Sequence, residues 1–309
     1  MNIVYNLQHV GLGNNGGSRT IIKCAETMAE LGHEVTLLMS HSGRNKYRWH
    51  KISGEVNVAY SANHPKCDVS IATGYSSVND TASSPAKRKF YYIRGYEIWR
   101  ASKANLLASY KLLNCVVNSR WLKKMLQKKG IKSHLVYPGV DSDLFYNLDL
   151  PRDNAFGAIF SKRHETKKHK HSEKIGLSTG YDLRMLNKHI KSPTPKQQNE
   201  WYNKLKVWHS PSELEGLHNP PIEAGLAGCA LVCSGHKMAG TQDYAIHNQT
   251  AMVYDAGDLD TAASHIQMLM NDEKRRKELN ANLVSYLKIN IGDRKTNMQK
   301  LINIMVQHG

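Results

Sequence analysis

Two carboxylates, Glu215 and Glu223, are separated by seven residues within residues 210–227, SPSELEGLHNPPIEAGLA. Pro220 and Pro221 are suited to the first turn of a helix, so Glu223 is expected inside that turn and Glu215 on the loop before it. Carboxylates accept hydrogen bonds from vicinal hydroxyls, which suits the pair to a sugar or a ribose at the mouth of the helix. A favourable interaction with the helix dipole is the structural alternative for Glu223.

A glycine-rich loop follows the first apolar run of the chain, with four glycines in residues 10–17, VGLGNNGG. Gly13, Gly16 and Gly17 allow backbone N–H groups to approach a ligand closely, and the helix that follows offers its positive end to an anion. Arg19 can add charge there. The spacing is that of neither a P-loop nor a dinucleotide fingerprint. A plain strand-to-helix turn therefore remains the structural alternative.

The elements around this loop alternate between strand and helix. Residues 2–7 are a short apolar run, residues 18–31 place apolar side chains on one helical stripe, and residues 33–39 return as a buried strand. A strand–helix–strand unit of this kind predicts a right-handed parallel crossover. Residues 119–129 predict a further helix, and more strands are expected over residues 56–60, 68–72, 89–93, 115–117 and 135–137. The pattern predicts an open, doubly wound, Rossmann-like α/β domain over residues 1–150.

A second α/β domain is expected over residues 151–287, beginning with the strand 155–160. A polar, basic stretch follows from Ser161 to Lys174. Its later elements are expected as helices over 195–204 and 219–228 and as strands over 205–209, 229–233 and 251–254. The tail, from Leu259 to about Val306, is expected to be helical, and residues 288–309 form a C-terminal helix whose return to the first domain is left open. Two such lobes facing each other place a cleft between the carboxyl ends of both sheets.

The charge balance favours an anionic partner. The 309-residue chain carries 42 Lys and Arg against 26 Asp and Glu, a net charge of +16. Residues 1–150 contribute 20 basic and 10 acidic residues, a net of +10. A phosphate-bearing substrate, an acidic membrane surface, an anionic polymer and a nucleic acid all fit this surplus, and a solvated surface is the alternative. The basic helix 119–129 can lie on a membrane, although packing of its apolar face on its own domain is favoured.

Composition also excludes several classes of protein. No run approaches eighteen uncharged apolar residues, and the first residues lack the features of a signal peptide. The five cysteines have no zinc-ligand spacing and are expected to be buried, reduced thiols. These observations predict a cytoplasmic protein, and peripheral attachment to the membrane is left open.

Several segments in order along the chain resemble the retaining glycosyltransferases of the GT-B fold, in the large family 4 (group 1). The Glu-x7-Glu segment resembles their donor-binding motif. The resemblance extends to GGSR with the later GHEVTLLM, to NSRWLKKMLQKKGI and VYPGVDSDLF within residues 118–145, and to DAGDLDTAASHIQMLMND, residues 255–272. It implies a GT-B fold, two Rossmann-like doubly wound domains facing a central cleft, with the first domain for the acceptor and the second for the nucleotide sugar.

The resemblance also implies roles for residues of the second domain. Glu223 would bind the ribose hydroxyls, and Glu215 would contact the donor sugar. Backbone amides of Gly216, Leu217 and His218 would lie beside that sugar. Arg163 and Lys168 match the family's basic pair that clamps the diphosphate, and Lys167 fits the lysine position equally well. Fixed cations of this kind can stabilise a diphosphate leaving group, so a metal-independent reaction is expected.

First-domain residues complete the expected site. Gly16, Gly17 and Arg19 would close on the diphosphate. Glu97 and Arg94, in the segment YYIRGYEIWR, and His9 after the first strand are candidates for the acceptor side, although Glu97 can also simply pair with Arg94 or Arg100. The chain departs from the family where Gly216-Leu217-His218 replaces the usual Gly-Phe-Gly.

The resemblance therefore predicts a retaining hexosyltransferase that moves a sugar from a nucleoside diphosphate sugar, with a UDP- or GDP-sugar favoured. The acceptor would be a hydroxyl of an anionic or membrane-associated molecule: a lipid-linked saccharide, a polysaccharide or a hydroxylated nucleic-acid base. A non-catalytic module of the same fold that binds a nucleotide or polyanion is the alternative.

Overall fold

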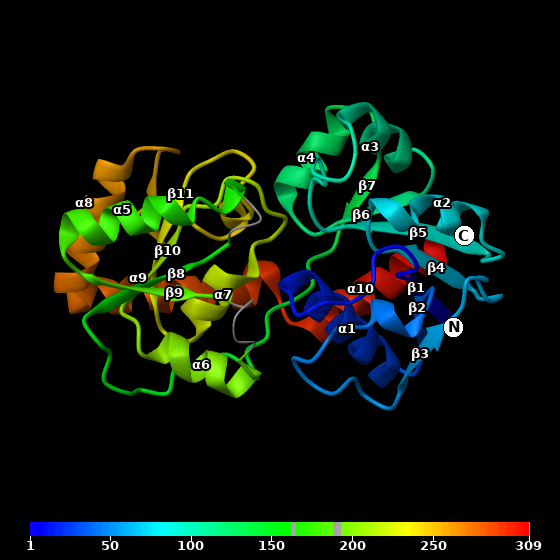
Figure 1. Cartoon of the computed structure of the whole chain (residues 1–309), viewed down its shortest axis with the longest axis horizontal. Coiled ribbons are helices and arrows are strands. Elements are labelled where there is room, and N and C mark those ends of the chain that lie inside the picture. The colour runs from blue at the N-terminus through cyan, green and yellow to red at the C-terminus, as the bar shows by residue number, and fades with distance from the viewer. Residues whose placement is uncertain (162–164, 188–192, 309) are drawn as a thin grey trace. The chain divides into compact units, whose positions relative to one another are not determined.

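The computed structural model describes residues 1–161, 165–187 and 193–308. The chain divides into two compact units (Figure 1). Unit 1 comprises Met1–Gly139 and Arg294–Gly309, and unit 2 comprises Val140–Asp293.

Unit 1 is built on a parallel sheet with the strand order β3-β2-β1-β4-β5-β6-β7. The order reverses between β1 and β4, so the loops after these two strands flank the topological switch point, where ligands of open α/β sheets normally bind. The strands are β1 Asn2–Asn6, β2 Glu34–Met39, β3 Val56–Tyr60, β4 Val69–Ala72, β5 Arg88–Ile93, β6 Asn114–Val117 and β7 Ser133–Leu135.

Helices cover both faces of this sheet. Right-handed crossovers put α2, α3 and α4 on one face, because β4 to β7 step in one direction, and α1 on the other, because β1 to β2 steps back. α10 packs beside α1 (Figure 1). The unit 1 helices are α1 Gly16–Glu30, α2 Val78–Ser83, α3 Lys103–Tyr110, α4 Arg120–Gln127 and α10 Arg294–Gln307, with short 3-10 turns at Ser42–Arg44 and Tyr75–Ser77.

Unit 2 has a parallel sheet with the order β12-β11-β10-β8-β9, so its switch point lies between β8 and β10. Its strands are β8 Ala155–Ile159, β9 Asp182–Leu186, β10 Val207–Ser210, β11 Ala230–Ser234 and β12 Met252–Tyr254. Its helices are α5 His169–Thr179, α6 Pro195–Asn203, α7 Asn219–Leu226, α8 Leu259–Asn271 and α9 Glu273–Tyr286, with a π-helical turn at Leu287–Ile291 and 3-10 turns at Glu165–Lys167 and Gly240–Asp243.

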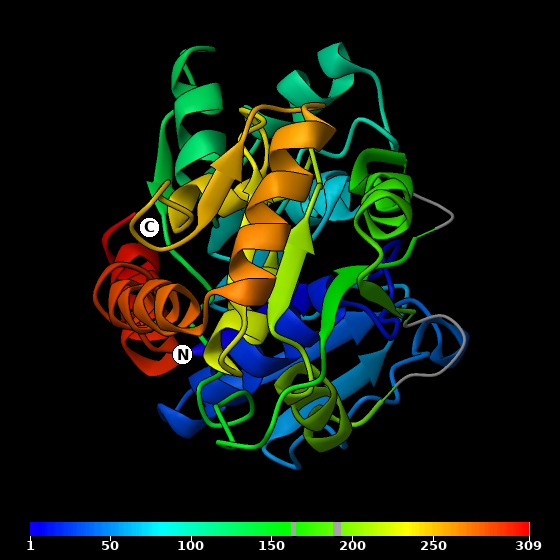
Figure 2. The same ribbon diagram turned by 90° about the vertical axis from the view of Figure 1, so that its left-hand side faces the viewer.

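The core of unit 2 lies between the sheet and helices α5 and α8 (Figure 2). Phe156, Val207 and Val232 come from three neighbouring strands, and Ile266 and Leu269 of α8 pack against them. This apolar layer fixes the sheet and leaves the loops at its carboxyl edge to carry polar side chains.

Two parallel-sheet α/β domains were predicted from the sequence, and the structure confirms them. Residues 140–150, assigned to the first domain by sequence, belong to unit 2. The reason is local: the backbone N–H of Tyr146 donates to Asn199 Oδ1 at 3.1 Å, and that of Leu148 to Asn203 Oδ1 at 2.8 Å. The C-terminal α10 belongs to unit 1.

Several elements were missed or placed differently. The basic stretch 161–174 was assigned no helix or strand from the sequence, but α5 begins at His169 and buries Ser172 and Ile175. The helical tail is interrupted by a new N-cap at Asp272 and by the π-helical turn. All five cysteines are buried and none forms a disulfide, as expected. In the residues that the structure describes, no helix is long and apolar enough to cross a bilayer.

Candidate functional site

Charged side chains join the two loops that flank the switch point of unit 2. Lys167, at the end of the loop after β8, forms an ion pair with Glu215 on the loop after β10. Beside it, Lys168 Nζ lies 3.3 Å from Glu213 Oε2. The backbone N–H of Glu213 also donates to the carbonyl of Thr166 at 2.9 Å. Paired lysines and glutamates therefore stand where the fold normally binds its ligand.

Lys167 and Glu215 are mostly buried, with side-chain exposures of 19% and 17%. Burial lowers the pKa of the Lys167 ammonium to about 8, because desolvation disfavours its charged form. The neighbouring Glu215 carboxylate favours that charged form, so Lys167 is a cation at neutral pH. Lys168 adopts a left-handed backbone conformation (φ 51°) directly before α5.

The loop before α7 holds Glu215 beside a buried histidine. His218 Nε2 lies 3.7 Å from Glu215 Oε1, and its Nδ1 lies 3.1 Å from Ser210 Oγ. His218 caps α7 with a positive φ of 60°, and its carbonyl accepts a hydrogen bond from Tyr244 OH at 2.8 Å. These contacts fix the turn from Gly216 to His218 at the N-terminus of α7.

The chain at Gly240 closes over this turn from the other side. A Cβ added at Gly240 would overlap the carbonyl of Gly216 and the backbone of Leu217, so only glycine allows the approach. The backbone N–H of Glu215 donates to the carbonyl of Met238 at 3.1 Å. The position of Glu215 therefore depends on the loop after β11 as well as on its own.

Glu223 lies deeper, with 3% of its surface exposed. Its Oε2 accepts hydrogen bonds from Gln198 Nε2 at 2.6 Å and from Tyr202 OH at 3.1 Å, both on α6. The prediction that Glu223 belongs to the first turn of the helix is wrong. The helix starts at Asn219, one residue before the prolines, which moves Glu223 into the second turn.

His209, a buried histidine that was not among the predicted site residues, links helix α5 to strand β12 of unit 2. His209, in β10, contacts Ser172 Oγ through Nδ1 at 2.8 Å and Tyr254 OH through Nε2 at 2.9 Å. Complete burial lowers its pKa to about 3, so its ring is neutral. No pattern in the sequence points to this link between α5 and β12. Glu213 was detectable, because it shares the loop with Glu215 at a spacing of two.

The switch point of unit 1 is organised differently. Arg94, just after β5, donates from Nη1 to the carbonyl of Gly17 at 2.7 Å and from Nη2 to that of Thr73 at 2.5 Å. Its guanidinium thus ties the start of α1 to the loop after β4. Glu97 Oε2 accepts from the backbone N–H of Tyr75 at 2.9 Å, and burial raises the pKa of the Glu97 carboxyl.

The glycine loop is closed by its own side chains. Asn15 caps α1 by accepting from the N–H of Ser18 at 2.9 Å, and Ser18 Oγ accepts from the N–H of Gly13 at 2.9 Å. α1 starts at Gly16, two residues before the predicted start. One of the free N–H groups at the start of α1, that of Ser18, is therefore already bound by Asn15. This is the arrangement of an ordinary capped helix.

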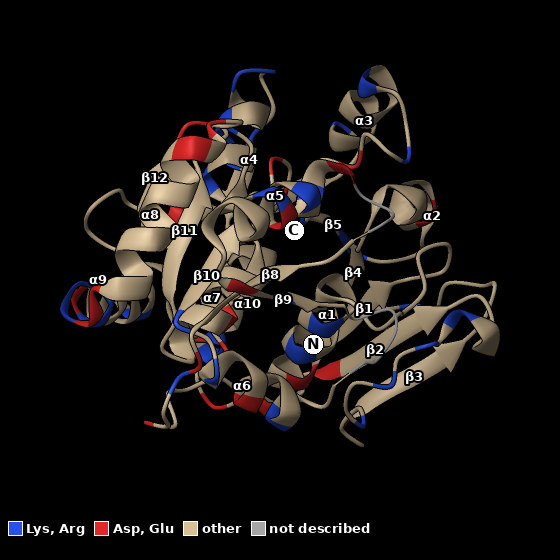
Figure 3. Cartoon of the chain, turned by 60° about the vertical axis from the view of Figure 1, so that its left-hand side comes forward, with Lys and Arg blue, Asp and Glu red and all other residues tan. Residues whose placement is uncertain are grey.

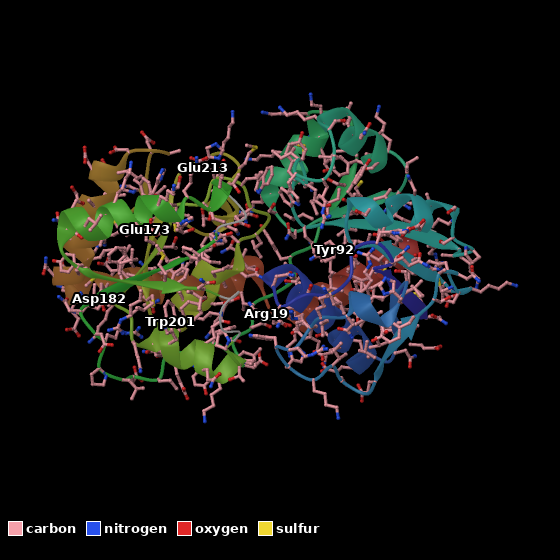
Figure 4. All side chains as sticks on the ribbon, viewed as in Figure 1. Arg19, Tyr92, Glu173, Asp182, Trp201 and Glu213 are labelled. Atoms are coloured by element: carbon pink, nitrogen blue, oxygen red, sulfur yellow. The ribbon has the colours of Figure 1, made fainter. Side chains whose placement is uncertain are left out.

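Two further candidates of unit 1 have protein partners. Arg19, on the first turn of α1, is buried, and its guanidinium lies 4.3 Å from the centre of the Trp49 ring. His9 is half exposed, with Nε2 2.9 Å from Asp80 Oδ2. Figure 4 labels Arg19 on unit 1 and Glu213 on unit 2.

The structure thus brings Glu215, Lys167 and His218 together, sets Lys168 beside Glu213, and buries Glu223 on α7. Arg163 lies outside the described residues. Across the described ranges, no group of three or more His, Cys, Asp or Glu side chains is placed to hold a metal ion.

The basic helix α4 packs on its own domain. Trp121, Leu122 and Leu126 are buried, which is the packing that the sequence favoured for this helix. Five basic side chains of α4 and the residues after it are exposed, namely Arg120, Lys123, Lys124, Lys128 and Lys129. Figure 3 colours the Lys and Arg positions of the chain blue.

Comparison with solved structures identifies the fold. The chain superposes on the sucrose-phosphate synthase of Thermosynechococcus elongatus with a TM-score of 0.81, 13% identity and coverage of 99% of this chain and 98% of the other. HepE of Anabaena, solved with UDP and glucose, gives a TM-score of 0.76 at 13% identity, covering 99% of both chains. The chain has the GT-B fold.

Sequence comparison finds similarity over only part of the chain. No protein-family profile matches the chain. The capsular polysaccharide biosynthesis glycosyltransferase CapM of Staphylococcus aureus is 28% identical over 98 residues, 32% of this chain. That match spans 24% of CapM, about a quarter of its length.

Proposed function

We propose that the protein is a retaining glycosyltransferase that moves a sugar from a nucleoside diphosphate sugar to a hydroxyl of an anionic or membrane-associated acceptor. The observation that carries the proposal is the pairing of Lys167 with Glu215 and of Lys168 with Glu213 across the switch point of unit 2. A GT-B fold with this loop and helix pattern binds its nucleotide sugar there in the family that the sequence resembles.

The residues present suit the two ends of such a donor. Glu215 can accept hydrogen bonds from the hydroxyls of the sugar, and the N-terminus of α7 beside it offers backbone N–H groups. The diphosphate would take the lysine ammonium from its carboxylate partner, since a dianionic group competes strongly for a cation. Lys167, which contacts Glu215, is the better placed lysine for this role, and Lys168 is the second.

The proposed chemistry is front-face substitution at the anomeric carbon. The bond from that carbon to the diphosphate oxygen breaks, the bond to the acceptor oxygen forms on the same face, and the acceptor proton passes to the departing phosphate. Lys167 would stabilise the charge that develops on the diphosphate. This scheme needs no protein nucleophile.

Relatives support the donor class. HepE has been solved with UDP and glucose and with UDP-glucose, and CapM is described as a glycosyltransferase of capsular polysaccharide biosynthesis. We propose a UDP- or GDP-sugar as the donor here and a saccharide acceptor that carries negative charge.

A donor screen tests the proposal. Uridine, guanosine, thymidine and adenosine diphosphate sugars are incubated with the full chain, thermal stability is followed and release of the nucleoside diphosphate is measured. One donor should raise the melting temperature, by the mass action of binding to the native state, and should be hydrolysed slowly. Binding without release by any donor, even with acceptors present, would identify a nucleotide-binding module instead.

Retention of the anomeric configuration is tested by a separate experiment. The product formed from an α-configured donor should carry an α-glycosidic linkage, read from the anomeric coupling constant by NMR. A β-linked product would contradict the retaining mechanism and leave the donor assignment intact.

A further inference from the structure

The loop between β2 and β3 in unit 1 carries cations that the proposed donor site does not use. We propose that residues 44–51, here named the basic strap, bind the anionic groups of an extended, negatively charged oligosaccharide. The inference rests on the proposed function, because it assigns the strap to the acceptor.

Side chains alternate along the strap. Tyr47 and Trp49 are buried, with 4% and 8% of their surfaces exposed, whereas Arg44, Lys46 and Arg48 are exposed. Arg44 ends the 3-10 turn Ser42–Arg44. After it, the alternation of burial puts Lys46 and Arg48 on the solvent side, opposite Tyr47 and Trp49. Lys51 adds a fourth exposed cation at the end of the strap.

Backbone contacts hold the strap against the glycine loop. Leu12 donates its N–H to the carbonyl of Arg44 and accepts from the N–H of Lys46, both at 2.8 Å. The N–H of Arg48 donates to Asn14 Oδ1 at 2.6 Å. These bonds use the main chain of the strap, and among the basic side chains Arg48 also donates from Nη1 to the carbonyl of Tyr47 at 2.5 Å.

Inward side chains pin the strap to α1. Trp49 stacks under the guanidinium of Arg19, with 4.3 Å from its Cζ to the ring centre. Glu26 Oε1 lies 3.1 Å from His50 Nε2 and accepts from the N–H of Ser53 at 3.0 Å. A strap anchored at both ends presents its cations in a fixed row, which lowers the entropic cost of binding a repeating anion.

Carboxylates do not neutralise this row. Among the residues that the structure describes, none forms an ion pair with Arg44, Lys46 or Arg48. Glu26, which supports the strap from α1, is occupied by His50, Ser53 and Lys23. The row therefore offers uncompensated positive charge to a ligand, in contrast to the paired lysines of unit 2.

The aromatic residues favour a saccharide over a nucleic acid. Single-stranded nucleic acids are held by several aromatic faces on which successive bases stack. Here Tyr47 and Trp49 face inward, and Tyr60, 46% exposed, is the large aromatic side chain that reaches solvent next to the strap, where its OH accepts from Asn45 Nδ2 at 3.1 Å. One exposed ring beside a row of cations suits one sugar ring between charged groups.

Direct binding tests the inference without any donor. The probes are fluorescein-labelled hexagalacturonate and a labelled glycerol-phosphate hexamer, which separate carboxylate from phosphate recognition, with neutral maltohexaose and a ten-residue oligothymidylate for comparison. Binding to the full chain is measured by fluorescence anisotropy. At least one anionic probe should bind, and maltohexaose should not.

Two charge-matched variants locate the site. R44Q/K46Q/R48Q removes three exposed cations from the strap, and K123Q/K124Q/K128Q removes three from α4 and the residue that follows it in the same unit. The strap variant should weaken binding of the anionic oligosaccharide about tenfold or more at 0.1 M salt, whereas the α4 variant should stay within about twofold. The melting temperatures should match, since the substituted side chains are exposed.

Each other outcome overturns the inference. Equal losses of binding in both variants would mean that net charge alone attracts the probe. If the unaltered chain binds the oligothymidylate as tightly as the saccharides, and the strap variant loses that binding, the strap is a nucleic-acid site. Release of nucleoside diphosphate by the unaltered chain reports the proposed function independently. A protein that hydrolyses its donor but whose strap variant binds the oligosaccharides normally would keep its function and lose this site.

Discussion

The switch points of the two units have the same topology, but the groups that join their loops differ. In unit 1 one guanidinium, that of Arg94, donates to two backbone carbonyls, one at Gly17 in the first turn of α1 and one at Thr73 in the loop after β4. In unit 2 the corresponding loops are joined by Lys167 with Glu215 and Lys168 with Glu213. Backbone carbonyls cannot leave their partner without unfolding a loop, whereas a lysine can exchange a carboxylate for a phosphate. The comparison predicts a structural role for the first cation and a ligand-dependent role for the second.

The largest expected effect comes from Glu215→Gln, which keeps the shape of the side chain and removes its charge. Release of nucleoside diphosphate should fall about a hundredfold, equivalent to about 2.7 kcal/mol of transition-state stabilisation. Initial rates with the donor found in the screen measure the effect. Glu273→Gln, which alters an exposed pair with Lys277 on α9, is the matched control and should change the rate less than about twofold. Undiminished release of nucleoside diphosphate by the Glu215 variant would contradict a ligand-dependent role for the charged pairs of unit 2.

Gly240→Ala tests whether the approach of the second loop positions Glu215. The added methyl would overlap the carbonyl of Gly216, so unit 2 should lose about 2 kcal/mol of stability, and the donor KM should rise. Gly54→Ala is the control, because its Cβ would meet nothing within 4 Å. Thermal melting and donor kinetics are measured together. Normal KM with lowered stability would make this contact purely structural.

The pH dependence of donor use tests the lysine. Since the pKa of Lys167 is lowered to about 8, its charged fraction falls as pH rises through that value, and kcat/KM for the donor should fall about tenfold between pH 7.5 and pH 9. Lys167→Arg keeps the cation charged and should move this alkaline limb to higher pH. If kcat/KM of the Lys167→Arg variant falls over the same pH range as in the unaltered chain, the titrating group is not Lys167.

Arg94→Lys gives the smallest effect and tests the unit 1 half of the comparison. A lysine can reach one of the two carbonyls with a single ammonium, so unit 1 should lose about 1 kcal/mol and melt a few degrees lower. Arg100→Lys, at an exposed position nearby, should have no measurable effect on melting. Donor release should be unchanged in both variants. A loss of acceptor-dependent activity beyond the loss of stability would give Arg94 a functional role.

Particular segments show how far the sequence could be used. The alternation of apolar runs with helical stripes was enough to predict two parallel α/β domains, because burial on both faces leaves continuous apolar strands. The spacing within Ser210 to Ala227 made Glu215 and Glu223 candidates for a sugar site, and the resemblance to the family suggested their roles. The helix predicted over 219–228 does start at Asn219, but Glu223 is the fifth residue of α7 and therefore lies in its second turn.

Amino-acid types and their order determined the strands, the helix that follows the proline pair, the excess of positive charge and the buried thiols, since each depends on local patterns of polarity and backbone preference. The tertiary structure decided which charges meet: Lys167 with Glu215 across two loops, Arg94 with carbonyls far from it in the chain, and His209 with side chains of α5 and β12. Such pairings depend on the order of strands in a sheet, which brings distant loops to one edge, and no local pattern records that order.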